Sequence, residues 1–192
     1  MNKIKFMNYP SLIILDRDGV INEDSDNYIK SADEWIPIKG SIEAISKLSQ
    51  KNIPIAIATN QSGLGRNYFN SMTLFDMHQK MLQLIKNQNG EIQYIAYCPH
   101  LPNNHCNCRK PKPGLINEIS QKLNIKLDKH VYFIGDSFKD IEVAQNSNIT
   151  PILVKTGKGE KTLEKNPQIK GKIAIYDNLN QFVEYLLKEV IN

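Results

Sequence analysis

Two aspartates stand two positions apart at the end of a short apolar run near the start of the chain. Asp16 and Asp18 follow Leu12–Leu15, with Arg17 between them and Gly19 after them. An extended chain projects residues two apart in similar directions, and a glycine allows a sharp exit from the strand. Carboxylates paired in this way can hold Mg²⁺, and one of them can attack phosphorus to form an aspartyl-phosphate. The alternative is that both side chains only cap a turn.

Three further segments carry the groups that phosphoryl transfer needs. Thr59–Gly63 offers hydroxyl, amide and backbone N–H donors, Arg109–Pro111 supplies two cations, and Gly135–Asp140 holds two carboxylates four positions apart. Each also has an ordinary interpretation: a helix N-cap, a solvated basic turn, or acidic groups that complement a helix dipole. Because chemically capable residues follow successive apolar runs, one shared phosphoryl-transfer site is the simpler explanation.

A second group of residues has the spacing of a metal site. Three cysteines and a histidine fall within eleven positions: Cys98, His100, Cys106 and Cys108. An odd number of clustered cysteines argues against a disulfide framework. Three thiolates and one imidazole form a closed tetrahedral set for Zn²⁺, which predicts a structural zinc that fixes the loop before Arg109. His105 is an alternative fourth ligand, although the repeated C-x-[CH] spacing favours His100, and three free buried cysteines are the other alternative.

The hydrophobic pattern predicts the elements that position these groups. Amphipathic stretches predict helices around residues 42–48, 74–85, 115–123 and 179–190. Short, continuously apolar runs are typical of strands buried on both faces of a parallel sheet. Six such runs are present: Leu12–Leu15, Ile55–Ala58, Ile95–Tyr97, Val131–Ile134, Ile152–Val154 and Ile173–Ile175. The alternation predicts an α/β fold with a doubly wound, mostly parallel, Rossmann-like sheet, whose ligands lie outside the carboxyl ends of the strands.

The domain organisation is expected to be simple. We expect residues 1–192 to form a single domain without a separate cap domain, because no large insertion follows the first strand or separates the middle strands. The lysine-rich segment Lys155–Lys172 is interpreted as a surface loop.

Composition and charge exclude several classes of protein. The 192 residues are 41% hydrophobic and 23% charged, and no apolar run near the start approaches the roughly 20 residues of a membrane span. We therefore expect a cytoplasmic protein without membrane contacts. The formal net charge is +4, with 24 Lys and Arg against 20 Asp and Glu. Its lysines are scattered and only three residues are arginine, which favours a small anionic ligand over a nucleic acid.

Taken together, the Asp-Arg-Asp-Gly segment, Thr59, Lys110 and the acidic pair of Gly135–Asp140 resemble the haloacid dehalogenase superfamily of phosphohydrolases over essentially the whole chain. The resemblance implies that Asp16 is the nucleophile and Asp18 the general acid and base, with Thr59 and Lys110 stabilising the transferring phosphoryl group. It also implies catalytic Mg²⁺ held by the Asp16 carboxylate, the Asp18 backbone carbonyl and Asp136. Asp140 is then expected to lie next to these ligands without binding the ion itself.

Longer runs narrow the resemblance to a branch of the superfamily that hydrolyses sugar bisphosphates. These runs are DRDGVINEDSDNYIKS, ATNQSGLGR, CPH…CNCRKPKPGL, GDSFKD and TGKGE. The expected partner is then a small-molecule sugar bisphosphate, and we expect a monomer. The resemblance implies substrate contacts at Asp24, Ser25, Asp26, Asn27, Thr59, Asn60, Gln61, Ser62, Arg109 and Lys110.

Three alternatives remain for the function. Histidinol-phosphate phosphatases have a similar domain and the same short zinc loop, although TNQSGLGR and TGKGE favour the sugar bisphosphate branch. A phosphatase of DNA 3′ ends fits poorly with scattered lysines and scarce arginine. From a different class, the chain could be a non-catalytic binding module stabilised by zinc, but this leaves the matched acids and the lysine without a purpose.

Overall fold

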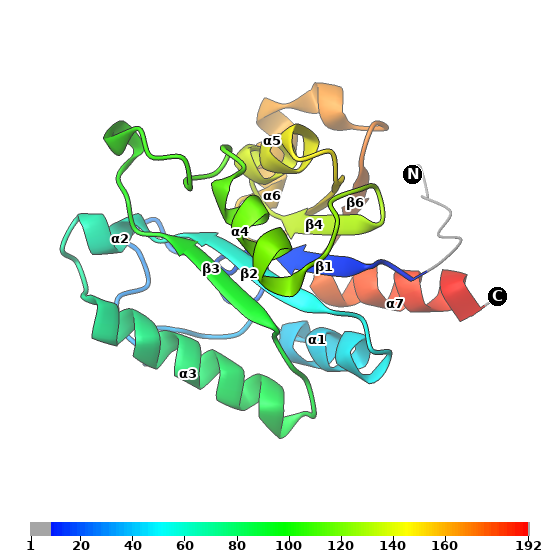
Figure 1. Ribbon diagram of the computed structural model, residues 1–192, viewed down its shortest axis with the longest axis horizontal. Helices are drawn as coiled ribbons and strands as arrows, with labels where there is room; N and C mark the ends of the chain where they lie inside the picture. The colour runs from blue at the N-terminus through cyan, green and yellow to red at the C-terminus, as the bar shows by residue number, and fades with distance from the viewer. Residues whose placement is uncertain (1–8, 192) are drawn as a thin grey trace.

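Six short strands form one parallel sheet in the order β3-β2-β1-β4-β5-β6 (Figure 1). The structure is a computed structural model, and it describes residues 9–191. The strands are β1 Leu12–Leu15, β2 Ile55–Asn60, β3 Tyr94–Cys98, β4 Val131–Gly135, β5 Thr150–Val154 and β6 Ala174–Tyr176. Each apolar run of the sequence overlaps one of these strands, and every neighbouring pair is parallel. The predicted doubly wound sheet is confirmed.

The central strand β1 lies between β2 and β4, and this placement decides where a ligand can bind. Ile13 of β1 is in register with Ile55 of β2 on one side and with Tyr132 of β4 on the other. The chain builds β2 and β3 outward in one direction and then returns to add β4, β5 and β6 in the other. The strand order therefore reverses between β1 and β4, and a crevice opens outside their carboxyl ends.

Helices cover both faces of the sheet. One face packs against α1 Ser41–Gln50, α3 Ser71–Asn87 and α7 Leu179–Ile191, and the other against α4 Gly114–Leu123 and α5 Phe138–Asn146 (Figure 1). Ile13 and Leu15 belong to the first core and Leu12 and Ile14 to the second, as the alternation along a strand requires. The four predicted helices are present, although the side chain of Val190 lies outside the described residues.

The interpretation of Lys155–Lys172 as a surface loop is wrong. This segment forms α6 Gly159–Lys165 and a 3-10 turn at Pro167–Ile169. Leu163 and Ile169 are buried against Ile141 of α5. Lysine is the most frequent residue type of the segment, so the few apolar side chains that anchor it were not recognised in the sequence.

The long connection between β1 and α1 runs without regular secondary structure. Residues 16–40 contain turns and isolated bridges but neither a helix nor a strand. Trp35 is fully buried and ties this connection to the core beside α1 and α3. Short elements complete the fold, namely α2 Ser62–Gly65 and a 3-10 turn at Pro102–Asn104. Within residues 9–191, no helix combines the length and the apolar character that crossing a membrane requires.

Candidate active site

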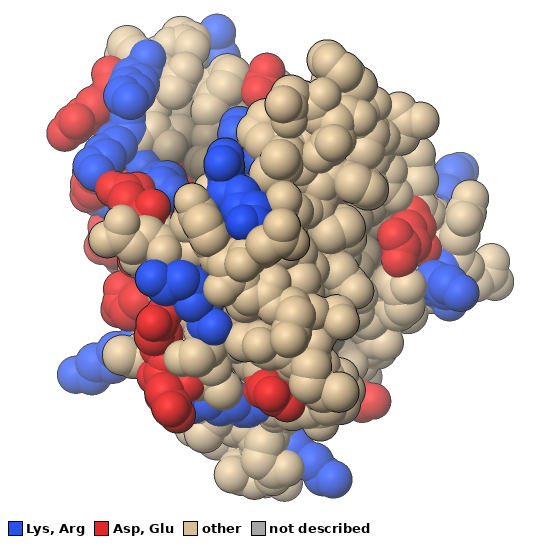
Figure 2. Space-filling model, turned by 90° about the vertical axis from the view of Figure 1, so that its left-hand side faces the viewer, with Lys and Arg blue, Asp and Glu red and all other residues tan. Residues whose placement is uncertain are grey.

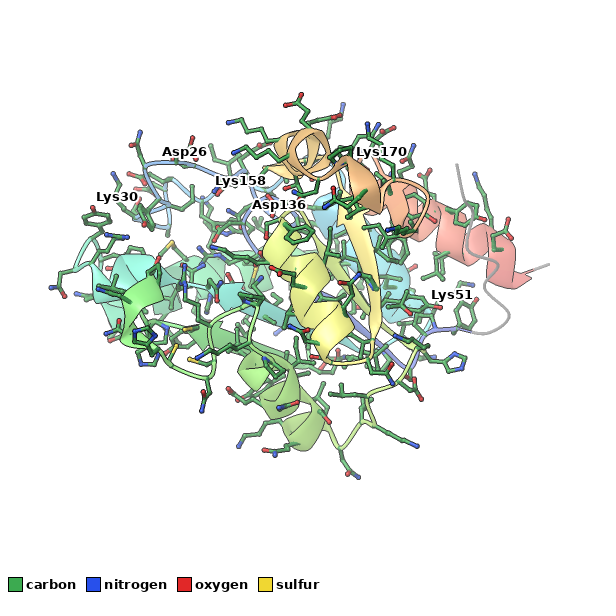
Figure 3. The ribbon with its side chains drawn as sticks, turned by 90° about the horizontal axis from the view of Figure 1, so that it is seen from above. Asp26, Lys30, Lys51, Asp136, Lys158 and Lys170 are labelled. Carbon is green, nitrogen blue, oxygen red and sulfur yellow. The ribbon has the colours of Figure 1, made fainter. Side chains whose placement is uncertain are left out.

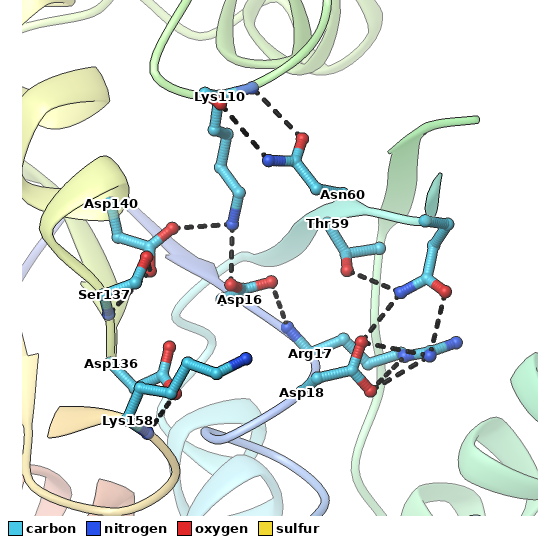
Figure 4. Close-up of polar contacts among 11 residues, drawn as sticks. Asp16, Arg17, Asp18, Thr59, Asn60, Lys110, Asp136, Ser137, Asp140 and Lys158 are labelled. Carbon is cyan, nitrogen blue, oxygen red and sulfur yellow. Dashed lines mark hydrogen bonds and ion pairs between the residues drawn. The ribbon is translucent and has the colours of Figure 1, made fainter. Parts of the chain in front are cut away.

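The ammonium group of Lys110 joins two carboxylates at the carboxyl ends of β1 and β4 (Figure 4). Its Nζ atom lies 2.7 Å from Oδ2 of Asp16 and 2.6 Å from Oδ1 of Asp140. Only 2% of the Lys110 side chain is exposed. Burial acts to lower the pKa of Lys110, but the attraction of Asp140 and Asp16 outweighs it and raises this pKa above its ordinary value. Lys110 is therefore a fixed positive charge on the floor of the crevice.

The backbone of Lys110 is held in place by Asn60, the last residue of β2. The side-chain oxygen of Asn60 accepts a hydrogen bond from the backbone N–H of Lys110 at 3.1 Å, and its amide nitrogen donates to the Lys110 carbonyl at 3.3 Å. Both ends of the amide are thus used on the chain itself. Asn60 lines the crevice, as the sequence predicted, but its polar atoms anchor the loop that carries Lys110.

Asp140 caps the helix that begins beside the crevice and pairs with Lys110 at the same time. Its Oδ2 atom accepts hydrogen bonds from the backbone N–H of Ser137 at 3.0 Å and from the Ser137 hydroxyl at 2.6 Å. Its Oδ1 atom faces Lys110. Because both oxygens are engaged and the residue is 1% exposed, Asp140 holds the lysine and the start of α5 in position.

Asp136 is buried beneath two backbone segments that approach it closely. Its Oδ2 atom accepts a hydrogen bond from the backbone N–H of Lys158 at 2.7 Å, and its carbonyl accepts one from the Thr162 hydroxyl at 2.9 Å. Gly19 and Gly157 both have positive φ, and a Cβ atom on either would lie only 2.1 or 2.2 Å from the same carboxylate oxygen. The sequence needs glycine at both positions so that these loops can enclose Asp136.

The carboxylates of Asp16, Asp136 and Asp140 form a group that a divalent cation would complete. One oxygen of each lies within 4.8 Å of the others. Burial raises the pKa of Asp16 to about 7, although Lys110 opposes this, and burial together with Asp140 and Asp16 raises the pKa of Asp136 to about 8. Burial is the main cause of both shifts, and a divalent cation bound between the carboxylates would lower both pKa values. Oxygen ligands of this kind fit Mg²⁺, and Asp16 and Asp136 have the capacity to hold it.

Asp18 occupies a different environment on the other side of Asp16 (Figure 4). Its carboxylate receives hydrogen bonds from the side chains of Arg17, Asn22 and Gln61. Burial acts to raise its pKa, but the Arg17 guanidinium and these hydrogen bonds outweigh burial and hold the pKa of Asp18 below its ordinary value. Asp16 and Asp18 are therefore electrostatically distinct, although only one residue separates them.

A cleft of about 440 Å³ opens above these groups. All but one of the predicted catalytic, magnesium and substrate residues line it, namely Asp16, Asp18, Asp24, Ser25, Asp26, Thr59, Asn60, Gln61, Ser62, Arg109, Lys110 and Asp136. Asn27 is the exception. It lies in a neighbouring hollow with Tyr28 and Lys30, because a turn from Ser25 to Tyr28 directs it away from the cleft.

Sequence reasoning missed several residues of this cleft, of which Lys158 is the most prominent. Its Nζ atom lies 2.8 Å from Oδ2 of Asp24 and 3.8 Å from Oδ1 of Asp26. Figure 3 shows Lys158 between Asp136 and the loop of Asp26. The run TGKGE contained it, but its many neighbouring lysines suggested only a solvated surface.

On the face of the molecule drawn in Figure 2, basic and acidic side chains are interspersed, and no broad basic area is seen.

The predicted zinc ligands also meet in space. Cys98 Sγ lies 3.1 Å from Cys108 Sγ and 3.6 Å from both Cys106 Sγ and His100 Nδ1, and His100 Nδ1 lies 3.2 Å from Cys108 Sγ. Tetrahedral zinc with such ligands separates them by about 3.5–3.8 Å, so the set fits one ion after small adjustments. Burial raises the pKa of Cys98 to about 12. Burial acts in the same sense on Cys106, but hydrogen bonds from the backbone of Arg109 and from the thiols of Cys108 and Cys98 together outweigh it and lower that pKa to about 7.

The architecture and this cleft together define a class of enzyme. A parallel sheet with an Asp-x-Asp pair after its central strand, a buried lysine and a second acidic pair after the neighbouring strand is the arrangement of haloacid dehalogenase-like phosphohydrolases. A family model described as HAD-hydrolase-like matches residues 107–182.

Comparison with individual proteins identifies the family within this class. The chain is 49% identical to a D-glycero-beta-D-manno-heptose-1,7-bisphosphate 7-phosphatase from Pseudomonas aeruginosa, over 93% of this chain and 98% of the relative. It is 45% identical to the protein of that name from Neisseria meningitidis serogroup B, over 93% and 95%. The crystal structure of D,D-heptose 1,7-bisphosphate phosphatase from B. bronchiseptica, complexed with magnesium and phosphate, is similar with a TM-score of 0.89 and 41% identity, covering 93% and 99%. The chain belongs to the family of D-glycero-beta-D-manno-heptose-1,7-bisphosphate 7-phosphatases.

Replacing Lys110 by methionine should destabilise the protein in a pH-dependent manner. The variant Lys110→Met leaves the Asp16 and Asp140 carboxylates buried without their cation, which should cost about 3–5 kcal/mol at pH 8. Because Lys110 lowers the pKa of Asp16, its loss raises this pKa further above the unfolded value. A carboxyl of that kind costs stability as the pH rises and much less when it is protonated, so the loss should shrink at pH 5.

Urea unfolding at both pH values measures this effect. Lys122→Met, at an exposed position of α4, is the control and should change the free energy of unfolding by less than about 0.5 kcal/mol at either pH. Equal losses for the two variants, or a loss for Lys110→Met that does not depend on pH, would contradict the buried ion pair.

Proposed function

We propose that the chain is a Mg²⁺-dependent phosphatase that removes the 7-phosphate of D-glycero-β-D-manno-heptose 1,7-bisphosphate through an aspartyl-phosphate. The observation that carries the proposal is the Asp16 carboxylate at the switch point of the sheet, paired with Lys110 and grouped with Asp136. The family membership and the magnesium and phosphate bound by the B. bronchiseptica enzyme support the substrate, its β-anomer and the metal. The proposed place of the reaction is the route to nucleotide-activated heptose for lipopolysaccharide.

In the first half-reaction, Asp16 supplies the nucleophile. A carboxylate oxygen of Asp16 forms a bond to phosphorus while the bond from phosphorus to the sugar 7-oxygen breaks. Asp18 gives its proton to that oxygen, and the negative charge of the incoming phosphoryl group favours the protonated form of Asp18 that this step requires. Lys110 stabilises the charge on the transferring group. The Thr59 hydroxyl accepts a hydrogen bond from Gln61 at 2.9 Å, so its own proton remains available for a phosphoryl oxygen.

In the second half-reaction, water attacks the phosphorus of the aspartyl-phosphate. Asp18, now ionised, accepts a proton from this water, and the bond between phosphorus and Asp16 breaks to release inorganic phosphate. The Mg²⁺ ion, when bound, neutralises charge on the Asp16 and Asp136 carboxylates and on the phosphoryl oxygens. The two aspartates thus divide the work, one as nucleophile and the other as proton carrier.

The sugar and its second phosphate are proposed to occupy the outer part of the cleft. A volume of about 440 Å³ falls within the range of small-molecule sites. Asp24, Ser25 and Asp26 on one side offer acceptors and a hydroxyl for sugar hydroxyls, while Arg109 and Lys158 offer positive charge to the 1-phosphate. Ser62 is proposed to contact the phosphoryl group beside Thr59. The proposal keeps the expectation of a single phosphatase domain that acts as a monomer in the cytoplasm.

A comparison of substrates tests the proposed function. The wild-type protein with Mg²⁺ should release phosphate from heptose 1,7-bisphosphate faster than from fructose 1,6-bisphosphate, histidinol phosphate or a 3′-phosphorylated oligonucleotide. Asp16→Asn removes the nucleophile and should lower kcat by about 10³-fold or more. Asp76→Asn, an exposed position on α3, should leave kcat unchanged.

The outcomes of this comparison separate the hypotheses. A preference for histidinol phosphate would replace the heptose substrate by the rival one. Equal activity of Asp16→Asn and Asp76→Asn would overturn the nucleophile, and no hydrolysis by the wild type would favour the binding module.

We also propose that Cys98, His100, Cys106 and Cys108 bind one structural Zn²⁺. The site lies next to Arg109, whose Nη1 atom donates to the carbonyl of His100 at 3.2 Å. The low pKa of the Cys106 thiol favours the thiolate that zinc requires. By fixing this loop, zinc would hold Arg109 and Lys110 in position without touching the substrate.

Metal analysis of two histidine variants tests the zinc site. The purified protein should contain about one zinc per chain. His100→Ala should lose most of it on dialysis against a mild chelator, because a ligand is missing. His105→Ala, the matched control in the same loop, should keep it. Loss of zinc from His105→Ala alone would assign the fourth ligand to His105, and absence of zinc from the wild type would end the zinc hypothesis.

A further inference from the structure

Asp18 is held by an unusually complete set of donors. The guanidinium of Arg17 grips its carboxylate, with Nε at 3.2 Å and Nη2 at 3.0 Å from Oδ1 and Nη2 at 3.1 Å from Oδ2. Asn22 adds a hydrogen bond to Oδ1 at 2.9 Å, and Gln61 adds one to Oδ2 at 2.8 Å. A carboxylate with donors on both oxygens has one orientation, which a proton carrier needs when it must reach a leaving oxygen.

Gln61 joins three groups of the site and has no donor left for a substrate. Its amide nitrogen donates one hydrogen to Asp18 and the other to the hydroxyl of Thr59 at 2.9 Å. Its carbonyl oxygen accepts a hydrogen bond from Nη2 of Arg17 at 3.1 Å. A glutamine amide has two hydrogens, so both are used. The residue is only 4% exposed, and its polar atoms serve the chain itself.

Arg17 is also directed at Asp18 rather than at the substrate position. The residue is 1% exposed, and Nε and Nη2 both face the Asp18 carboxylate. In Figure 4 the guanidinium extends away from Asp16, on the far side of Asp18. Burying an arginine is costly unless its charge is paired, so the buried Arg17 depends on the Asp18 carboxylate as its partner.

We propose that Arg17 and Gln61 form a clamp of positioning residues that orients the Asp18 carboxylate toward the leaving oxygen. This inference rests on the proposed phosphatase function and deepens it. The clamp acts on proton transfer and not on substrate binding. Its removal therefore harms those substrates whose leaving oxygen must be protonated, and spares those whose leaving group departs as an anion.

Kinetics with two leaving groups test the clamp. Gln61→Leu and the milder Gln61→Met and Arg17→Lys are compared with the wild type on heptose 1,7-bisphosphate, an alkyl ester, and on 4-nitrophenyl phosphate, an aryl ester. The constant kcat/KM reports steps up to formation of the aspartyl-phosphate. It should fall by about 10²-fold for the alkyl ester and by less than about 5-fold for the aryl ester. The kcat for the aryl ester should fall more than its kcat/KM, because Asp18 also acts as the base in the second half-reaction.

A phosphate-contacting residue provides the matched control. Ser62→Ala changes the same loop, but it removes a proposed contact to the phosphoryl group. Because both esters carry that group, it should lower kcat/KM for both by the same factor. Thermal melting checks that each variant is folded. If Gln61→Leu does not fold, Gln61→Met and Arg17→Lys still test the clamp.

The outcomes distinguish the clamp from its alternatives. Equal losses for the two esters in the Gln61 and Arg17 variants would overturn the clamp and leave these residues as substrate contacts or structural supports. Wild-type protein that hydrolyses neither ester would overturn the proposed function, and the clamp with it.

Discussion

Four carboxylates and two cations are gathered at the base of the cleft, and within this group the charges do not balance. Asp16, Asp18, Asp136 and Asp140 face Lys110 and Arg17, which leaves an excess of two negative charges when all are ionised. Burial makes this excess negative charge costly. Burial and the neighbouring carboxylates together raise the pKa values of Asp16 and Asp136. A divalent cation supplies the missing charge, so the site is built to be completed by Mg²⁺. The Asp18 carboxylate escapes the same effect because Arg17 neutralises it locally.

The fold keeps these charges together by using contacts that also stabilise its own elements. The reversal of strand order brings the ends of β1 and β4 side by side, which places Asp16 next to Asp136. Asp140 caps α5 and pairs with Lys110, and Asn60 ties the backbone of Lys110 to the end of β2. The contacts that stabilise the start of α5 and the backbone of Lys110 therefore also fix the positions of the charged groups in the site. The proposed zinc would in the same way hold the loop before Lys110 in one conformation.

Much of this arrangement could be predicted from the sequence, because some signals are local. Apolar runs such as Leu12–Leu15 locate the strands, and polar residues directly after them must meet at one edge of a parallel sheet. Other features depend on contacts that no local pattern records. The pairing of Gln61 with Arg17 spans 44 positions, and the role of Lys158 depends on a loop that folds back over Asp136. The position of Asn27 in a neighbouring hollow depends on the turn from Ser25 to Tyr28, which the sequence pattern did not indicate.

Calorimetry of Mg²⁺ binding in buffers of different ionisation enthalpy measures the consequence of this excess negative charge. Protons held by Asp16 and Asp136 must leave when the ion binds, so on the order of one proton should be released per Mg²⁺ at pH 7. The affinity should strengthen between pH 6 and pH 8.5, and Asp136→Asn should abolish most of the release. Binding without proton release, at an affinity that is constant over this range, would show that Asp16 and Asp136 carry no excess charge for the ion to neutralise.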